Sequence, residues 1–150
     1  MLTIAEIMNT DLVTLAEDDN LSLARELMAN HRIRHLPVVD SAGKLVGLVT
    51  QRDVLAAADS TLLSKPDAAV KPESYIAVSS VMTVSVHKIT ETTNLRAAAM
   101  YLQKHKIGCL PVERKGKLVG IVTDSDFVTV AVHLMELLEA QEPDEFGLVD

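Results

Sequence analysis

The sequence predicts an α+β fold, α/β in broad terms, built from two copies of a strand–helix–strand–strand–helix unit related by an approximate twofold axis. Three observations predict it. Residues 31–38 read HRIRHLPV, and residues 105–112 read HKIGCLPV. A second shared run follows each, GKLVGLVTQRD at 43–53 and GKLVGIVTDSD at 116–126. The apolar spacing around both copies also changes between strand and helix periods in the same order. We therefore expect two facing halves with paired, equivalent sites between them.

Each copy begins with a short apolar segment, residues 12–15 in the first and 84–89 in the second, which predicts a brief strand. An amphipathic helix follows, because an N-cap residue precedes apolar side chains at helical spacing. In the first copy the cap is Asp19 or Asn20, and the apolar positions are Leu21, Ala24, Leu27 and Met28. In the second copy the cap and the apolar positions are Asn94, Leu95, Ala98, Tyr101 and Leu102.

A hairpin and a closing helix complete each unit. Residues 36–39 and 110–113 are short strands, and a turn with Gly43 or Gly116 leads into strands 45–49 and 118–122. Helical spacing then resumes after Thr50 and Thr123. The last helix, from about 124 to 141, is the longest and has a broad apolar face. This face is broader than one chain is expected to bury, so we hypothesise that it forms the interface of a homodimer.

These elements divide the chain into four parts. Residues 1–58 form the first repeat, with a helical lead-in predicted by the capping box of Thr3 and Glu6. Residues 59–78 form a linker, because Pro66 and Pro72 interrupt regular structure. Residues 79–138 form the second repeat, and 139–150 form an acidic tail. We expect a disordered tail, the alternative being a tail that tucks against a basic cleft.

Composition excludes several classes of partner. A net charge of −7 and 3% aromatic residues make nucleic acid a poor partner. The chain shows no basic leader and no apolar run long enough to span a membrane. The single Cys109 lies in an apolar stretch and is predicted to be a buried hydrophobe, which suits a reducing cytoplasm. No metal site is predicted, since His31 and His35 straddle the end of the predicted helix and no cysteine or paired acid joins them.

The Leu-Pro-Val strand followed by Gly-Lys-Leu-Val-Gly-(Leu/Ile)-Val-Thr-x-x-Asp resembles the cystathionine-β-synthase (CBS) domain, and a tandem pair resembles the Bateman module. The resemblance covers roughly residues 4 to 138, so the chain resembles a stand-alone pair and no other domain is identified. It implies that an adenosine-containing ligand, such as AMP, ADP, ATP or S-adenosylmethionine, binds between the repeats. It implies no required cofactor.

The resemblance also assigns residues to parts of that ligand. It places the ribose-binding carboxylate on Asp53 and Asp126, and a hydroxyl on Thr50 and Thr123. It places the base against the strand edges and the early strands of the two repeats, at Leu36, Pro37, Leu110, Pro111, Leu12, Val13, Val86 and His87. Cys109, beside Leu110, is a further candidate ligand-binding residue.

The Thr-x-x-Asp pattern has a physical rationale of its own. A carboxylate in the first turn of a helix can accept charge-assisted hydrogen bonds from two ribose hydroxyls, and the helix N-terminus favours a phosphate. The same pattern also suits simple helix capping. Its repetition within two matching cassettes favours binding for at least one copy.

The two repeats differ where a phosphate is expected. Arg34 and His35 in the first repeat correspond to Gly108 and Cys109 in the second, and Arg52 corresponds to Ser125. We therefore expect the first cleft to favour a phosphorylated ligand. The second has mainly three basic residues nearby, Lys88, His105 and Lys106. The alternative is that the cluster at Arg34, His35 and Arg52 is only a solvated basic rim.

Two functions follow from these patterns. The first is a regulatory module whose ligand shifts the population of two arrangements of the repeats or of two chains, acting on an unknown downstream protein. The alternative is a structural homodimerisation module with vestigial ligand sites. An enzyme is not expected, because the sequence has no glycine-rich phosphate loop, nucleophile elbow or catalytic cluster. No catalytic residue is assigned.

Overall fold

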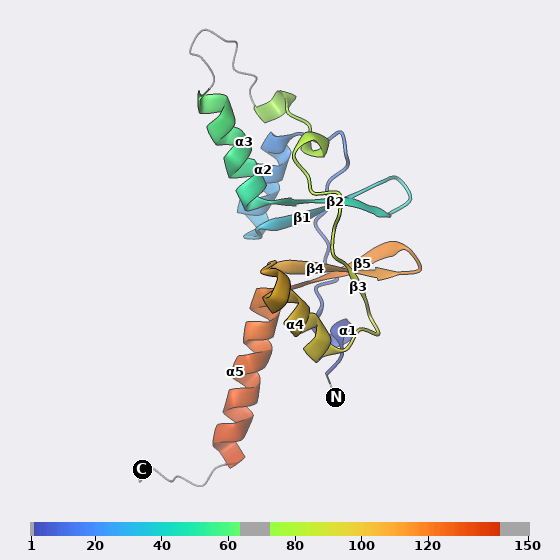
Figure 1. Ribbon diagram of the computed structural model, residues 1–150, viewed down its shortest axis with the longest axis vertical. Helices are drawn as coiled ribbons and strands as arrows, with labels where there is room; N and C mark the ends of the chain where they lie inside the picture. The colour runs from blue at the N-terminus through green and yellow to red at the C-terminus, as the bar shows by residue number, and fades with distance from the viewer. Residues whose placement is uncertain (1, 64–72, 142–150) are drawn as a thin grey trace.

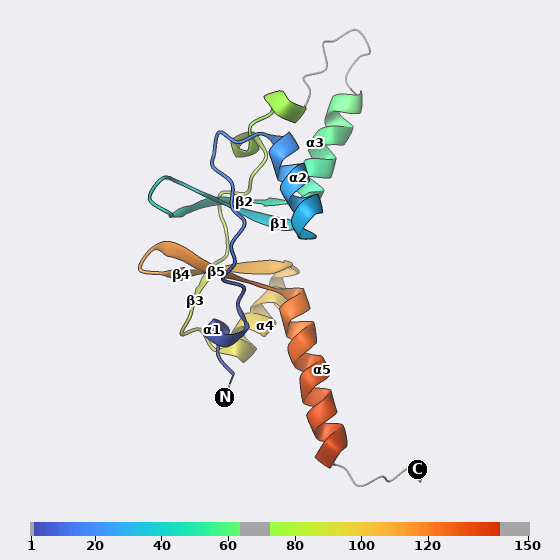
Figure 2. The ribbon, with the colours of Figure 1, turned by 180° about the vertical axis from the view of Figure 1, so that it is seen from behind.

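The computed structural model describes residues 2–63 and 73–141. Two halves, each a small sheet covered by helices, lie one above the other with the sheets facing inward (Figures 1 and 2). In the first half the elements are α2 (Leu21–His31), β1 (His35–Val39), β2 (Leu45–Thr50) and α3 (Gln51–Leu63). In the second half they are β3 (Ile89–Thr90), α4 (Leu95–His105), β4 (Cys109–Arg114), β5 (Lys117–Thr123) and α5 (Asp124–Gln141). This arrangement confirms the predicted α+β duplication.

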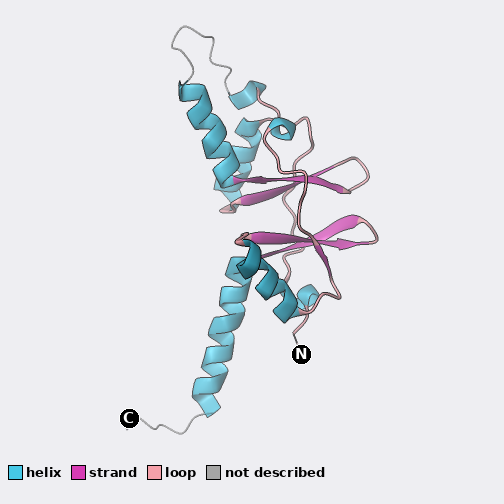
Figure 3. Cartoon of the chain, in the orientation of Figure 1, coloured by secondary structure: helices cyan, strands magenta, loops and turns pink. Residues whose placement is uncertain are grey.

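The two hairpins have matching registers. β1 and β2 are antiparallel, with His35 opposite Thr50, and β4 and β5 are antiparallel, with Cys109 opposite Thr123. Gly43 and Gly116 have φ of +82° and +77°, the left-handed backbone that glycine adopts without strain, and they turn each hairpin as predicted. The hairpins lie between the two sets of helices in Figure 3. Each pair therefore carries its threonine to the end of a strand, directly before a helix.

The helices begin where the sequence places their caps. The side chains of Asn20 and Asn94 accept hydrogen bonds from the backbone N–H groups of Leu23 and Ala97, at 2.9 and 3.2 Å. Asn20, rather than Asp19, is the cap of α2. α2 and α4 both end on a residue with left-handed backbone, Arg32 in one and Lys106 in the other. The same start and stop in both copies places the loops that follow at equivalent positions.

The segments that precede each repeat are exchanged between the halves. The short helix α1 (Ile4–Ile7), which has the predicted capping box, buries Ile4 in the core of the second half, although the sequence assigns it to the first. The 3-10 turns η1 (Glu73–Tyr75) and η2 (Val78–Ser80) precede the second repeat, and Val78 is buried in the core of the first. Each half therefore contains a piece of the other's chain.

Backbone pairing secures this exchange. Asn9 and Ile121 exchange two hydrogen bonds, and so do Thr83 and Leu48. Beside each pair, a methionine lies over a strand glycine, Met8 over Gly120 and Met82 over Gly47. We call residues 8–9 and 82–83 the crossing straps. Each strap adds an antiparallel bridge to a hairpin of the opposite half.

Several local predictions were wrong in extent. The predicted strand 12–15 forms only one bridge, at Leu15, and the predicted strand 84–89 is reduced to β3. The straps pair with the other strand of each hairpin, Asn9 with β5 and Thr83 with β2, whereas Leu15 and β3 pair with β1 and β4. Helix α3 continues to Leu63, five residues past the predicted boundary at 58. The acidic tail after Gln141 lies outside the described residues. Every helix within the described ranges is too short or too polar to cross a lipid bilayer.

Candidate functional site

Two clefts open between the halves. Cleft 1 has a volume of about 900 Å³ and combines residues from the start of α3 with residues of the second repeat. Its walls include Thr50 and Arg52 from the first half, and Val86, His87 and Cys109 from the second. Its apolar lining also contains Leu48, Leu55, Leu102, Ile107 and Phe127.

Cleft 2 has a volume of about 390 Å³ and has the reciprocal composition. Thr123 and Asp126, at the start of α5, face Leu12, Val13 and Pro37 of the first repeat. Ile33 and Ile121 add apolar surface. Each Thr-x-x-Asp motif therefore meets the early segment of the opposite repeat rather than that of its own, an arrangement that follows from the crossing straps.

Both Thr-x-x-Asp motifs cap their helices. Asp53 Oδ2 accepts from the Thr50 N–H at 2.8 Å, and Thr50 Oγ1 accepts from the Asp53 N–H at 3.2 Å. Asp126 Oδ2 accepts from the N–H and the hydroxyl of Thr123, at 2.8 and 3.2 Å. Only one oxygen of each carboxylate takes part in these bonds. Capping and ligand binding are therefore compatible at each site.

The two acids nevertheless differ in position. Asp126 lines cleft 2, whereas Asp53 does not line cleft 1, although Thr50 does. Both carboxylates are half-buried. The arrangement that the repeat pattern predicted for both sites is therefore complete only in cleft 2.

Three of the predicted wall residues lie elsewhere. Leu36, Leu110 and Pro111 are fully buried in the two cores and line neither cleft. Residues 109–112 of β4 and 36–38 of β1 are all buried, so burial does not alternate along these strand segments. The contact of a ligand base with Leu36, Leu110 or Pro111 therefore stays a prediction, and the side chains that line the clefts are others.

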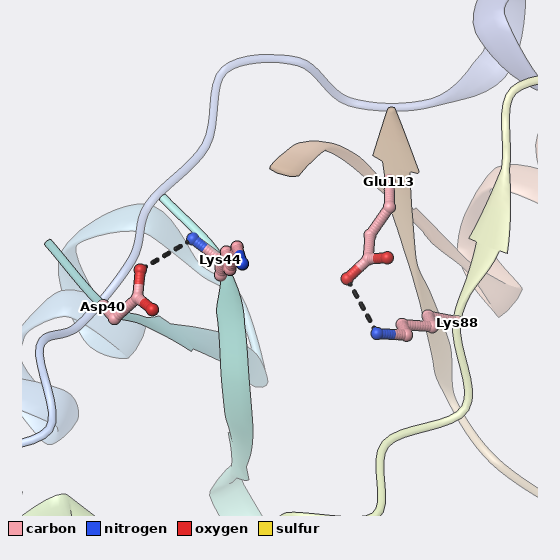
Figure 4. Close-up of polar contacts among 4 residues, drawn as sticks. All are labelled: Asp40, Lys44, Lys88 and Glu113. Atoms are coloured by element: carbon pink, nitrogen blue, oxygen red, sulfur yellow. Dashed lines mark hydrogen bonds and ion pairs between the residues drawn. The ribbon is translucent and has the colours of Figure 1, made fainter. Parts of the chain in front are cut away.

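Basic residues line both clefts: His31 and Arg32 line cleft 2 alone, Arg52 and Lys106 line cleft 1 alone, and Arg34 and His35 line both. Lys106, the residue that ends α4, lines cleft 1 and not the second cleft to which the sequence assigned it. Lys88 forms an ion pair with Glu113 at 3.0 Å and lines neither cleft. Figure 4 shows this pair together with the Asp40–Lys44 contact of the first hairpin.

An aromatic cluster borders cleft 1. The Tyr101 hydroxyl hydrogen-bonds to Nδ1 of His87, and the ring of His105 stacks on His87 with centroids 4.9 Å apart. His105 lines neither cleft, so its predicted place beside the second is also wrong. Its contact with His87 instead places it against the wall of the first.

Asp124 is the site residue that the sequence argument missed. It is the first residue of α5 and lines both clefts, opposite His35. The pKa of His35 lies below its ordinary 6.5, and burial is the largest cause. The negative charge of Asp124 opposes this shift, and the positive charge of Arg34 adds to it. Burial and the charge of Asp124 raise the pKa of the Cys109 thiol to about 12. The available signal was the repeat alignment, in which Asp124 replaces the neutral Gln51.

Among the residues that the structure describes, no three His, Cys, Asp or Glu side chains lie close enough together to hold a metal ion. The thiol of Cys109 is buried, as the sequence predicts.

Comparisons with known proteins support the reading of a tandem repeat. The CBS domain family matches residues 4–60 and 78–133. A CBS domain-containing protein of Dictyostelium discoideum is 32% identical, over 92% of this chain and 97% of its own. An inosine-5'-monophosphate dehydrogenase of Mycobacterium tuberculosis is 35% identical over 84% of this chain, but this match covers only 22% of the enzyme.

Solved structures share the fold over nearly the whole chain. The crystal structure of a putative acetoin utilization protein (AcuB) from Vibrio cholerae is 43% identical, with a TM-score of 0.78, covering 95% of this chain and 99% of that one. CBSX2 in complex with AMP is 30% identical, with a TM-score of 0.74, covering 90% and 99%. The CBS domain pair of MJ0100 in complex with 5'-methylthioadenosine and S-adenosyl-L-methionine is 25% identical, with a TM-score of 0.74, covering 87% and 99%. With both halves matched and the fold shared from end to end, the chain belongs to the CBS domain family as a tandem CBS pair.

Proposed function

We propose that this CBS pair is a regulatory module that binds an adenosine-containing ligand, such as AMP, ADP, ATP or S-adenosylmethionine, in the clefts between its halves. The observation that carries the proposal is the convergence, in each cleft, of a helix start with an apolar wall from the opposite repeat, with Thr50 in cleft 1 and both Thr123 and Asp126 in cleft 2. The volumes of about 900 and 390 Å³ lie within the range of about 300–1,000 Å³ that is usual for small-molecule sites. The similarity to CBSX2, whose structure contains AMP, supports the same ligand class.

In cleft 2, each part of a nucleoside has a partner. The free oxygen of Asp126 can accept from the ribose hydroxyls while Oδ2 caps α5. Leu12, Val13 and Pro37 supply an apolar wall for the base. The backbone N–H groups at the start of α5 favour a phosphate or another anionic group.

Cleft 1 favours a more strongly charged ligand. Arg52 and Lys106 lie on its two sides, and Arg34 adds a third cation. Thr50 lies at the start of α3 and supplies a hydroxyl, while Val86 and His87 border the opposite wall. We therefore assign a 5'-phosphorylated nucleoside to cleft 1. Binding would alter how the two halves sit against each other, because both contribute to each wall.

Thermal unfolding tests the proposal. A ligand present at about 100 times its Kd adds about 2.7 kcal/mol of stability, so AMP, ATP or S-adenosylmethionine should raise the Tm clearly. Asp126→Asn should weaken binding at cleft 2, whereas Glu17→Gln, a change to an exposed acid outside both clefts, should not. The absence of a Tm change with every adenosine compound would refute the proposal.

A homodimer is the second candidate function, and helix α5 favours it. None of its residues is buried, and six large apolar side chains are 48–62% exposed, namely Val128, Val132, Leu134, Met135, Leu137 and Leu138. Such a continuous apolar face is typical of an interface. Analytical ultracentrifugation of Met135→Glu should then give a lighter species than His133→Glu, a matched change on the polar side of the helix. Equal masses for both variants and the unchanged chain would count against this interface.

The remaining assignments stay predictions. We expect the module to lack catalytic activity of its own and to act in the cytoplasm on another protein. Incubation of labelled ATP with the chain would overturn the first expectation if a hydrolysis product formed.

A further inference from the structure

Three side chains belong to both clefts at once. Arg34, His35 and Asp124 line cleft 1 and also line cleft 2, whereas every other described lining residue borders only one of them. We call these three residues the shared wall. A change in position of one of them therefore alters both clefts.

The shared wall is closely packed. The ring of His35 lies over Gly108, where a Cβ atom would fall 2.7 Å from Nε2 and 2.9 Å from Cε1. The N–H of Asp124 donates to the carbonyl of Gly108 at 3.0 Å, and the N–H of Gln51 donates to the carbonyl of Arg34 at 2.8 Å. The backbone is therefore fixed on both sides, and the side chains are the part that can respond to a ligand.

The shared wall also breaks the symmetry of the duplication. Arg34 has glycine at the equivalent position, Gly108, and Asp124 has the neutral Gln51. The wall consequently holds one arginine and one acid for two clefts. The five N–H donors of a guanidinium lie in one planar fork, so Arg34 cannot bind a phosphate fully in both clefts at the same time.

The clefts differ in how much they depend on Arg34. Cleft 1 has Arg52 and Lys106 in addition. Cleft 2 is lined by Arg32 and His31 as well, but three acids line the same cleft, namely Asp11, Asp124 and Asp126. An anionic ligand in cleft 2 therefore needs Arg34 to offset the surrounding carboxylates, whereas an uncharged nucleoside does not.

We propose that the shared wall couples the two clefts negatively for anionic nucleosides. A phosphorylated nucleoside in one cleft draws Arg34 toward it and leaves Asp124 facing the other cleft, which then binds a second phosphorylated nucleoside more weakly. By thermodynamic linkage the penalty is the same whichever cleft fills first. Uncharged adenosine carries no such penalty. This inference rests on the proposed function and specifies how the two sites regulate each other.

Isothermal titration calorimetry on single-cleft variants tests the coupling. Ser85→Trp places a bulky ring in cleft 1 to obstruct it, and Asp11→Trp does the same in cleft 2, since each residue is exposed and lines one cleft alone. The Kd of the second AMP step in the unchanged chain is compared with the Kd of the same cleft when the other is blocked. We expect the second step to be about tenfold weaker, which is within the range of typical coupling energies. Adenosine should show less than about a twofold difference on the same comparison.

Arg34→Gln and Arg52→Gln provide a matched pair. Each removes one cation from cleft 1, but only Arg34 also borders cleft 2. Arg34→Gln should reduce the AMP coupling to less than about twofold, whereas Arg52→Gln should weaken cleft 1 and leave the coupling unchanged. Circular dichroism of both variants verifies that they are folded.

The outcomes separate the two proposals. Both clefts filling with their single-cleft affinities, or coupling that survives Arg34→Gln, would overturn the inference and leave the proposed function intact. Strong coupling would be supported if AMP binds to cleft 2 of Ser85→Trp but occupies only one cleft of the unchanged chain. The absence of AMP binding by Ser85→Trp would overturn the coupling, and the absence of any adenosine binding would refute the proposed function itself.

Discussion

The crossing straps can be tested at Gly47. A Cβ atom on this residue would lie 2.4 Å from Sδ, 2.8 Å from Cγ and 3.2 Å from Cβ of Met82. The clash extends to the base of the Met82 side chain, so rotation of its tip alone does not relieve it. Overpacking of this kind costs about 1–3 kcal/mol, and we expect Gly47→Ala to lower the free energy of unfolding by about 2 kcal/mol.

The double variant gives the sharper result. Met82 packs against the first core but is only partly buried, so Met82→Ala alone should cost about 2 kcal/mol, the lower end of the usual range. With Met82 shortened, the two closest contacts are removed and only the Cβ contact at 3.2 Å remains, and alanine is better than glycine in a strand by about 0.5–1 kcal/mol. The double variant should therefore be more stable than the sum of the single effects by about 2–3 kcal/mol.

Urea unfolding followed by circular dichroism measures these differences. Gly43→Ala serves as the control, because it has no neighbour within 4 Å of its Cβ position and its cost comes only from its φ of +82°. Its effect should add independently to that of Met82→Ala. If Gly47→Ala changes stability by less than about 0.5 kcal/mol, or if it adds simply to Met82→Ala, then the strap does not pack as described.

Three further predictions concern single residues. Because folding lowers the pKa of His35, the unfolded chain takes up a proton more readily than the folded chain does. The free energy of unfolding should therefore fall as the pH drops through 6.5. Urea titrations from about pH 7.5 to about pH 5.5 should show a smaller fall for His35→Gln. The Cys109 thiol, with its pKa near 12 and its burial, should react slowly with a disulfide reagent in the folded chain and quickly in urea; equal rates would show that the site is open. Removing the cap of α4 by Asn94→Ala should cost about 1 kcal/mol in the same unfolding assay, against a small effect of Arg96→Ala, a change to an exposed residue of the same helix.

Local signals predicted the elements well and the strand pairing less well. The caps at Asn20 and Asn94 and the turns at Gly43 and Gly116 depend on side-chain and backbone chemistry within a few residues, so the sequence locates them directly. The segments at 12–15 and 84–89 pair with the hairpin of their own repeat only at Leu15 and at β3. Their predicted strands were therefore mostly absent.

The candidate site shows the same division. The repeated Thr-x-x-Asp motifs predicted that two helix starts would carry matching polar groups, and both motifs cap a helix as expected. Their surroundings were harder to predict, because Lys88 and Lys106 both belong to the second repeat but have different neighbours in space. Lys106 lines cleft 1, and Lys88 pairs with Glu113.

The amino-acid sequence by itself determined that this protein is a duplicated unit with two capped helices facing a common interior, since repetition, period and capping are all local properties. Only the tertiary structure decided which half each lead-in segment joins, and hence that each motif faces the other repeat. It also brought Arg34, His35 and Asp124 into one wall between two clefts. The physical reason is that Ile4 is buried in the second core and Val78 in the first. This burial depends on packing between segments that are distant in the sequence, and no local sequence pattern relates them.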